Sequence, residues 1–262
     1  MKIALSIYLL TVIFAVTKCN ANINNFRPDI YNGKKALAQC IKEVKGRSYT
    51  NAITTLRKFE NEYHSSKYYP TSLILKSYLY YLTHNYVQTL LIVDDFLHQY
   101  PINRNASYVY YIKGMSNYKQ IMDIGRDPKF AVIAKKDFKI LNILYPYSPY
   151  TNNIQRKLAY ISNILVGKDM EIARFYMRIN KQILSANRLK SIIKKYRYSI
   201  FAPEALYRLL EIYYMLGAKN QACIITSVLS NNYSQSLWYY KSYKLLTKMK
   251  HTYYTEEYSK YK

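Results

Sequence analysis

The residues that could support catalysis or hold a metal ion are few and scattered. The four histidines are His64, His84, His98 and His251, and none lies three or four positions from another. A zinc site or a histidine-based hydrolase site needs such clustering, because its groups must converge on one point. We therefore expect all four histidines to be surface or turn residues, and we predict no catalytic site, no metal site and no cofactor.

Two neighbouring acids and two cysteines are the remaining candidates for chemistry. Asp94 and Asp95 are adjacent in a helical pattern, where neighbours point about 100° apart and do not share a face. Cys40 and Cys223 lie far apart along the chain, and we expect both to be small packed residues and not nucleophiles. The sequence therefore indicates a protein that acts through its surfaces.

The composition favours long helices over sheets. Half of the 262 residues are hydrophobic, which is enough for a core, and the chain has only 6 glycines and 7 prolines for tight turns. The formal net charge is +24, with more of the basic excess in the second half. Because the charge is spread along the chain, we interpret it as a solvated cationic surface and not as a nucleic-acid site; an acidic or phosphate-bearing partner is the alternative.

The first residues have the pattern of a secretory signal. Lys2 precedes an apolar run from Ile3 to Val16, which is shorter than the about 20 residues that a membrane span needs. We predict a signal peptide over residues 1–18, a lipid anchor on Cys19 and a linker over 19–30. Lys18 departs from the small residue that normally precedes a lipidated cysteine, so cleavage after Ala21 by an ordinary signal peptidase is the alternative.

Four stretches of the chain repeat one apolar pattern. Positions +4 and +7 from a small residue are apolar or aromatic, and position +11 is tyrosine. These offsets place the side chains on one helix face, with the tyrosine at the helix end. The copies are Ala52-Leu56-Phe59-Tyr63, Thr89-Val93-Phe96-Tyr100, Ala134-Phe138-Leu141-Tyr145 and a weaker Leu189-Ile192-Tyr196. We interpret each copy as the second helix of a pair.

The segments between the copies show the same helical period. Apolar residues at i, i+3, i+4 and i+7, as in 206–213 and 75–82, indicate the first helices, and Gly217 is placed to form a turn within a pair. Helical pairs of about 34 residues, with a small residue in the second helix and proline between pairs, are typical of tetratricopeptide repeats. We predict an all-α tetratricopeptide-repeat superhelix of about five helical pairs.

One segment breaks the even spacing of the repeats. No proline occurs from Thr151 to Asn180, and an apolar stripe continues throughout, which predicts a single long helix, weakest at Gly167, that joins two groups of repeats. We divide the chain accordingly into front repeats over 31–145, the long helix and rear repeats over 146–232, and a C-terminal helix and tail over 233–262. From His251 onward we expect the last helix to fray.

The order of these motifs resembles the BamD (ComL-type) family of periplasmic lipoproteins, which belong to the machinery that assembles β-barrel proteins in bacterial outer membranes. The most particular shared features are Arg126-Asp127-Pro128 before a second helix, the turn from Tyr145 to Tyr150, and the long helix ending near Ala173-Arg174-Phe175-Tyr176. The segment before Arg126 is shorter than in many members. The other matching segments are 52–63, 78–81, 94–101, 108–114, 134–138 and 186–188.

The resemblance implies a scaffold on the periplasmic face of the outer membrane, with two protein-binding regions. The front repeats would form a groove for unfolded outer membrane protein precursors, and the rear repeats would dock a soluble domain of BamA, the central barrel subunit. Transferred to this sequence, the groove residues are Tyr49, Asn51, Tyr69 and Tyr78, and the docking residues are Arg174, Arg178, Asn187 and Arg188. Arginine suits docking because its planar guanidinium can hold a carboxylate with two hydrogen bonds.

Two other classes of protein remain as alternatives. Another exported tetratricopeptide adaptor, serving peptidoglycan or cell division, would share the helical pairs but not the long helix with Ala-Arg-Phe-Tyr. A basic protein that binds nucleic acid or a membrane surface is disfavoured by export and by the spread of charge along the chain.

Overall fold

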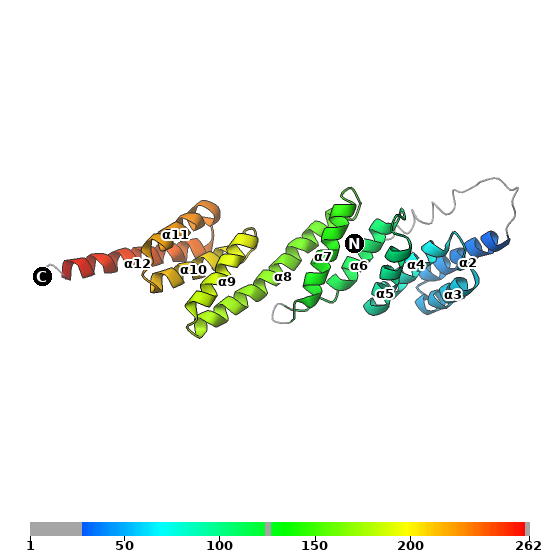
Figure 1. Cartoon of the computed structure of the whole chain (residues 1–262), viewed down its shortest axis with the longest axis horizontal. Coiled ribbons are helices and arrows are strands. Elements are labelled where there is room, and N and C mark those ends of the chain that lie inside the picture. The colour runs from blue at the N-terminus through cyan, green and yellow to red at the C-terminus, as the bar shows by residue number, and fades with distance from the viewer. Residues whose placement is uncertain (1–27, 124–126, 260–262) are drawn as a thin grey trace. The chain divides into compact units, whose positions relative to one another are not determined.

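The structure is a computed structural model that describes residues 28–123 and 127–259, and this part of the chain is built of helices without strands (Figure 1). The contacts divide the chain into two compact units, Met1–Thr83 and His84–Lys262. The first unit contains α2 (Pro28–Lys45), α3 (Tyr49–Glu62) and α4 (Tyr69–Leu82). The second contains α5 (Tyr86–Gln99), α6 (Ala106–Tyr118), α7 (Lys129–Leu144), α8 (Thr151–Arg178), α9 (Gln182–Lys195), α10 (Ala202–Met215), α11 (Lys219–Tyr233) and α12 (Leu237–Ser259).

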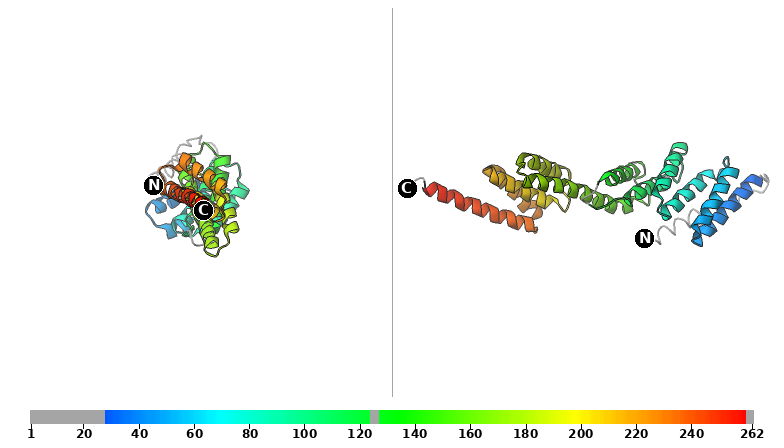
Figure 2. Two further views of the ribbon diagram at one scale, coloured as in Figure 1. Left: turned by 90° about the vertical axis from the view of Figure 1, so that its left-hand side faces the viewer. Right: turned by 90° about the horizontal axis from the view of Figure 1, so that it is seen from below.

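Successive helices pack against each other within each unit. In the first, α3 contacts both α2 and α4; in the second, each helix from α5 to α12 packs on the next one along the chain, as Figures 1 and 2 show. Within the units, α2 with α3, α6 with α7, α8 with α9, and α10 with α11 form closely packed helical pairs. The predicted all-α fold of repeated helical pairs is therefore confirmed, whereas the division into front and rear repeats at residue 145 stays a prediction.

The repeated apolar pattern is the buried face of the second helix in each pair. In α3, Ala52, Leu56 and Phe59 are fully buried and form the core of the first unit with Leu37, Cys40, Val44, Leu75 and Leu79. The equivalent residues of α5, α7 and α9 are buried as completely. In the second unit, α8, α9 and α10 share a core built from Val166, Met170, Ala173, Ala186, Leu189, Ile192, Ala205, Leu209 and Ile212.

The turn that links one pair to the next has the same construction each time. The closing tyrosine is the C-cap of its helix and donates its backbone N–H to the carbonyl four residues earlier. Three residues later a serine or asparagine side chain accepts the backbone N–H of the residue two positions on, at 2.9–3.4 Å. These residues are Ser66, Asn103, Ser148 and Ser199. The local bonds fix the direction in which the next helix starts.

The long helix is present as α8, which has 28 residues and continues through Gly167 without a break. Gly167 is buried, and α7 and α9 both pack on α8. Because α8 belongs to the contacts of both neighbours, it joins two successive pairs, as the apolar stripe predicts.

Two glycines have clear structural roles. Gly217 has a φ of +69° in the turn between α10 and α11, where a left-handed conformation favours glycine, so the predicted turn within a pair is confirmed. Gly114 lies in α6 against α7. A Cβ at this position would come 2.5 Å from the ring of Phe138, so glycine is required for the close approach of the two helices.

The structure describes the C-terminal helix but not the first 27 residues. The predicted signal peptide, Cys19 and most of the linker lie outside the described residues. At the other end, α12 continues to Ser259, so fraying from His251 is not observed. The last glycine is Gly217 and the last proline is Pro203, so neither residue is present to end this helix. None of the described helices is long and apolar enough to span a membrane.

Candidate functional site

The four predicted groove residues all lie in the first unit. Tyr49 and Tyr78 are half-buried against its core and close to each other; burial raises the pKa of Tyr78, and Tyr49 adds to this effect. Asn51 is exposed on α3. Tyr69 is buried, with only 8 % of its surface exposed, and its ring lies 4.4 Å from that of His64 in the turn before α4. The structure thus brings Tyr49 and Tyr78 together and buries Tyr69 at the start of α4.

Among the predicted docking residues, Arg174 is engaged within its own chain. Its Nε donates to Oε1 of Glu204 at 3.0 Å and its Nη2 to Oε2 at 2.6 Å. Glu204 is buried in the first turn of α10, whereas Arg174 is partly exposed on α8. Two parallel hydrogen bonds between a guanidinium and a carboxylate are a strong arrangement, so this pair fixes α10 against α8.

Arg188 also has an acidic partner, but only one hydrogen bond joins them. Its Nη1 donates to Oδ1 of Asp169 at 3.0 Å, and 42 % of the Arg188 side chain remains exposed. A guanidinium has five N–H donors, so most of them are still available at this residue. Arg178, near the end of α8, and Asn187, next to Arg188 on α9, are exposed.

These exposed polar residues lie beside an exposed apolar patch that the sequence did not single out. Ile183 and Leu184 precede Asn187 and Arg188 by one turn on the outer face of α9. Nε2 of Gln182 lies 3.9 Å from Sδ of Met215, which places the start of α9 against the end of α10. We call the following exposed residues the rear apolar patch: Phe175, Ile179, Ile183, Leu184, Met215 and Leu216.

A second cluster that sequence reasoning missed connects α10 to α12. Arg208 lies 3.5 Å from Glu204 and 2.8 Å from Glu211. Its guanidinium also stands 5.5 Å from the ring of Trp238 on α12, a cation–π distance. The spacings i, i+4 and i, i+3 among the three charged residues were a visible signal, because such residues are neighbours on a helix.

The histidines, acids and cysteines occupy separate places. Asp94 pairs with Lys113 at 2.7 Å, and Asp95 accepts a hydrogen bond from Gln99. Burial raises the pKa of the Cys40 thiol to about 12, so this thiol is protonated at neutral pH. Within residues 28–123 and 127–259 no group of three histidine, cysteine or carboxylate side chains is arranged to hold a metal ion.

Comparison with known proteins identifies the family. Residues 31–226 match the family YfiO, described as "Outer membrane lipoprotein". The chain is 30 % identical over 200 residues to "Outer membrane protein assembly factor BamD" of Rickettsia prowazekii (strain Madrid E), covering 76 % of this chain and 80 % of that protein. It is 28 % identical over 199 residues to the BamD protein of Caulobacter vibrioides, covering 76 % and 65 %.

Among solved structures, the chain resembles a thermophilic TPR protein of Thermus thermophilus, with a TM-score of 0.37 and 14 % identity, over 82 % of this chain and 99 % of that one. The family assignment rests on the sequence matches and not on this structure. The match to the family extends over α2 to α10 and much of α11, and therefore includes the regions of all eight predicted binding residues. The chain belongs to the YfiO family of outer membrane lipoproteins, together with the BamD proteins that it resembles.

Proposed function

We propose that this protein is a non-catalytic scaffold subunit of the complex that inserts and folds β-barrel proteins in the outer membrane, and that it acts on the periplasmic face. The observation that supports this most directly is the match to BamD assembly factors over 76 % of the chain, together with the family match at residues 31–226. A different exported tetratricopeptide adaptor would share paired helices without matching this family through α8 and α9.

The proposed dock for the BamA-like barrel subunit is the outer face of α9 together with the rear apolar patch. Exposed apolar side chains flanked by arginine are the usual composition of a protein-binding surface. Arg178, Asn187 and Arg188 would supply its polar contacts, because each is exposed. Arg174 would contribute indirectly, since its pairing with Glu204 ties α8 to α10, two helices that carry residues of the rear apolar patch.

The proposed site for unfolded precursors is the first unit around Tyr49, Asn51 and Tyr78. Tyrosine offers a broad ring and a hydroxyl at small entropic cost, which suits an extended peptide of varied sequence. We propose no nucleic-acid partner. A lipid on Cys19 would keep the chain at the membrane where precursors arrive.

Affinity purification from solubilised outer membranes tests this function. The tagged protein should recover a large barrel subunit, and failure to do so in mild detergent would argue against the assembly role altogether. The dock is tested by Ile183→Asp with Leu184→Asp, and separately by Arg188→Glu. We expect each to reduce recovery at least tenfold, because interface anchors typically contribute about 1.4 kcal/mol or more.

Matched substitutions elsewhere in the second unit serve as controls. Val87→Asp with Leu91→Asp changes two exposed apolar residues of α5, and Arg156→Glu reverses an exposed charge on α8. Recovery should stay close to that of the parent in both. Equal losses in control and dock variants would place the dock elsewhere while leaving the assembly role intact.

The groove is tested with a peptide that ends in the last strand of a barrel precursor. Asn51→Ala should weaken its binding without changing the melting temperature, because Asn51 is exposed on α3. Unchanged binding in both Asn51→Ala and Tyr78→Ser would remove the first unit as the precursor site.

A further inference from the structure

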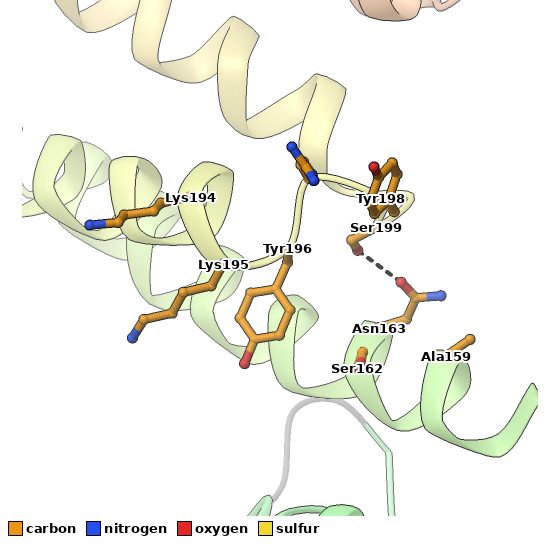
Figure 3. Close-up of a pocket in the computed structure, with 9 residues that line it drawn as sticks. Ala159, Ser162, Asn163, Lys194, Lys195, Tyr196, Tyr198 and Ser199 are labelled. Carbon is orange, nitrogen blue, oxygen red and sulfur yellow. Dashed lines mark hydrogen bonds between the residues drawn. The ribbon is translucent and has the colours of Figure 1, made fainter. Parts of the chain in front are cut away.

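A basic pocket of about 530 Å³ lies in the second unit, between the middle of α8 and the turn that joins α9 to α10 (Figure 3). Its lining includes Lys194 and Lys195 from the last turn of α9 and Arg197 from the turn itself. Ser162 and Asn163 line it from α8. The pocket is on the opposite end of α9 from the rear apolar patch, so it is separate from the proposed dock.

The positive charge of this pocket is not balanced by acidic side chains. In the described part of the chain none of Lys194, Lys195 and Arg197 forms an ion pair. The one acidic residue that acts on Tyr196 of the lining is Asp169, which is already held by Arg188. Lysines at the end of a helix are favoured by its dipole, but that effect does not explain Arg197, which lies beyond the helix. These basic side chains are therefore available to pair with an external anion.

A further positive charge comes from a third helix. Nζ of Lys135, on α7, stands 4.9 Å from the centre of the Tyr196 ring. Burial lowers the pKa of Lys135, and Lys139 on the same helix lowers it further. Lys135 would therefore add to the attraction of an anion that binds beside Tyr196.

The polar lining suits a phosphate group. Oγ of Ser199 donates to Oδ1 of Asn163 at 2.8 Å, which leaves the amide nitrogen of Asn163 as a donor. Figure 3 shows Ser162 and Asn163 on α8 and Ser199 on the turn, whereas Lys194 and Lys195 extend from the end of α9 away from these groups, beyond Tyr196. The fixed hydroxyl and amide groups can hydrogen-bond phosphate oxygens, and the flexible exposed lysines add positive charge nearby.

The same turn also exposes large apolar side chains. Tyr198 is 88 % exposed and Ile200 71 % exposed. The equivalent position of the two preceding turns, two residues after the closing tyrosine, is likewise occupied by an exposed apolar residue, Ile102 or Tyr147. In Figure 1 these three turns lie on the same side of the second unit. A soluble phosphate would leave these side chains in water, whereas tyrosine and isoleucine beside lysine are favourable at the headgroup level of a bilayer.

We propose that the α9–α10 turn docks on an anionic phospholipid surface and that its pocket receives a headgroup phosphate. Tyr198 and Ile200 enter the interface, and Lys194, Lys195 and Arg197 supply the positive charge that attracts the phosphate. This contact is additional to the N-terminal lipid, and it would fix the face that the second unit turns toward the membrane.

Vesicle co-sedimentation tests the proposal with the processed chain carrying Cys19→Ala, so that no covalent lipid contributes. The vesicles are phosphatidylcholine alone, or phosphatidylcholine with phosphatidylglycerol as the anionic lipid. We expect binding to the anionic vesicles, and about tenfold or greater weakening by Lys194→Gln with Lys195→Gln, since a basic residue near an anionic surface contributes roughly a factor of five.

The chain offers a close control for this charge change. Lys42→Gln with Lys45→Gln removes two lysines from the last turn of α2, and Arg47 follows that helix as Arg197 follows α9. We expect this pair to weaken binding less than about twofold, because distant exposed charges are screened by salt. If both double variants lost vesicle binding equally, net charge alone would explain the attraction, and the proposed role of the pocket would be refuted.

Two further measurements separate the sources of phosphate. Tyr198→Ser with Ile200→Ser should weaken vesicle binding several-fold while leaving the pocket charges in place. Glycerol 3-phosphate in millimolar excess should compete poorly, because it lacks the interface that the two apolar residues enter. Efficient competition together with no effect of the Tyr198 and Ile200 substitutions would assign the pocket to a soluble phosphate and refute membrane docking.

Discussion

Arg174 of α8 holds the buried carboxylate of Glu204 in α10 through two parallel hydrogen bonds, across 30 positions of sequence. Glu204 also lies beside Arg208, so one carboxylate balances two guanidinium groups. This arrangement connects helices of two successive pairs. Its loss should therefore lower the free energy of unfolding of the second unit.

Glu204→Gln is expected to lower the free energy of unfolding by about 2 kcal/mol. Breaking a buried ion pair costs about 3–5 kcal/mol, and the partial exposure of Arg174 reduces that figure by solvent screening. Urea unfolding followed by circular dichroism measures the change. Glu171→Gln, which alters an exposed acid of α8, is the control and should change stability by less than about 0.5 kcal/mol. Equal losses of stability in the two variants would mean that the Arg174–Glu204 pair does not stabilise the fold.

Gly114→Ala is expected to destabilise the protein by about 1–3 kcal/mol, because the added Cβ would lie 2.5 Å from the Phe138 ring. Gly46→Ala is the matched control, since the nearest atoms there are at 3.5 Å. Thermal unfolding of both variants makes the comparison. Phe138→Leu introduced together with Gly114→Ala should recover part of the loss, and a purely additive double variant would contradict the steric explanation.

Asp137→Asn is expected to stabilise the protein at neutral pH, by on the order of 1 kcal/mol. Burial raises the pKa of Asp137 against the opposing effects of the Asn117 hydrogen bond and Lys113. A carboxyl with a raised pKa in the folded state favours folding when protonated, and this contribution is lost as pH rises through the folded pKa. The substituted amide is neutral at every pH and can still accept the 2.8 Å bond from Asn117.

The pH dependence provides the check for Asp137. Unfolding free energies of parent and variant should differ at pH 7 and converge near about pH 3.5, below the unfolded pKa of about 3.9. A variant that is less stable than the parent at neutral pH would show that the carboxylate is favourably paired in the fold.

Cys40 and Cys223 are expected to react with thiol reagents at very different rates. Cys40 is buried with its pKa raised to about 12, whereas Cys223 is exposed on α11. In the processed chain with Cys19→Ala, a chromogenic disulfide reagent should titrate one thiol per native molecule and two in denaturant. Rapid reaction of both native thiols would contradict the burial of Cys40.

The fold could be predicted from the sequence because its repeat is local. The offsets from Ala52 to Leu56 and Phe59 recur in each copy, and a side chain at such spacing faces one side of a helix whatever lies around it. The serine or asparagine after each closing tyrosine also acts within its own turn. The continuity of α8 through Gly167 followed from the unbroken apolar stripe.

The pairing of charged residues could not be predicted in the same way. Arg188 meets Asp169 from 19 positions away, and Arg174 meets Glu204 from 30, so each contact depends on how two helices cross. The steric role of Gly114 depends likewise on the distance between α6 and α7. The rear apolar patch was not visible because its residues come from three helix ends.

The uninterrupted course of α8 has a mechanical consequence. At about 1.5 Å per residue its 28 residues extend about 42 Å, and a helix without proline or a bulge resists sharp bending. A binding partner that tilts α8 is therefore expected to move it as a rigid rod, together with its contacts to α7 and α9. Because α8 has no internal hinge, we expect a force on α9 and α8 to reach α7 as a rotation of α8 and not as a bend within it.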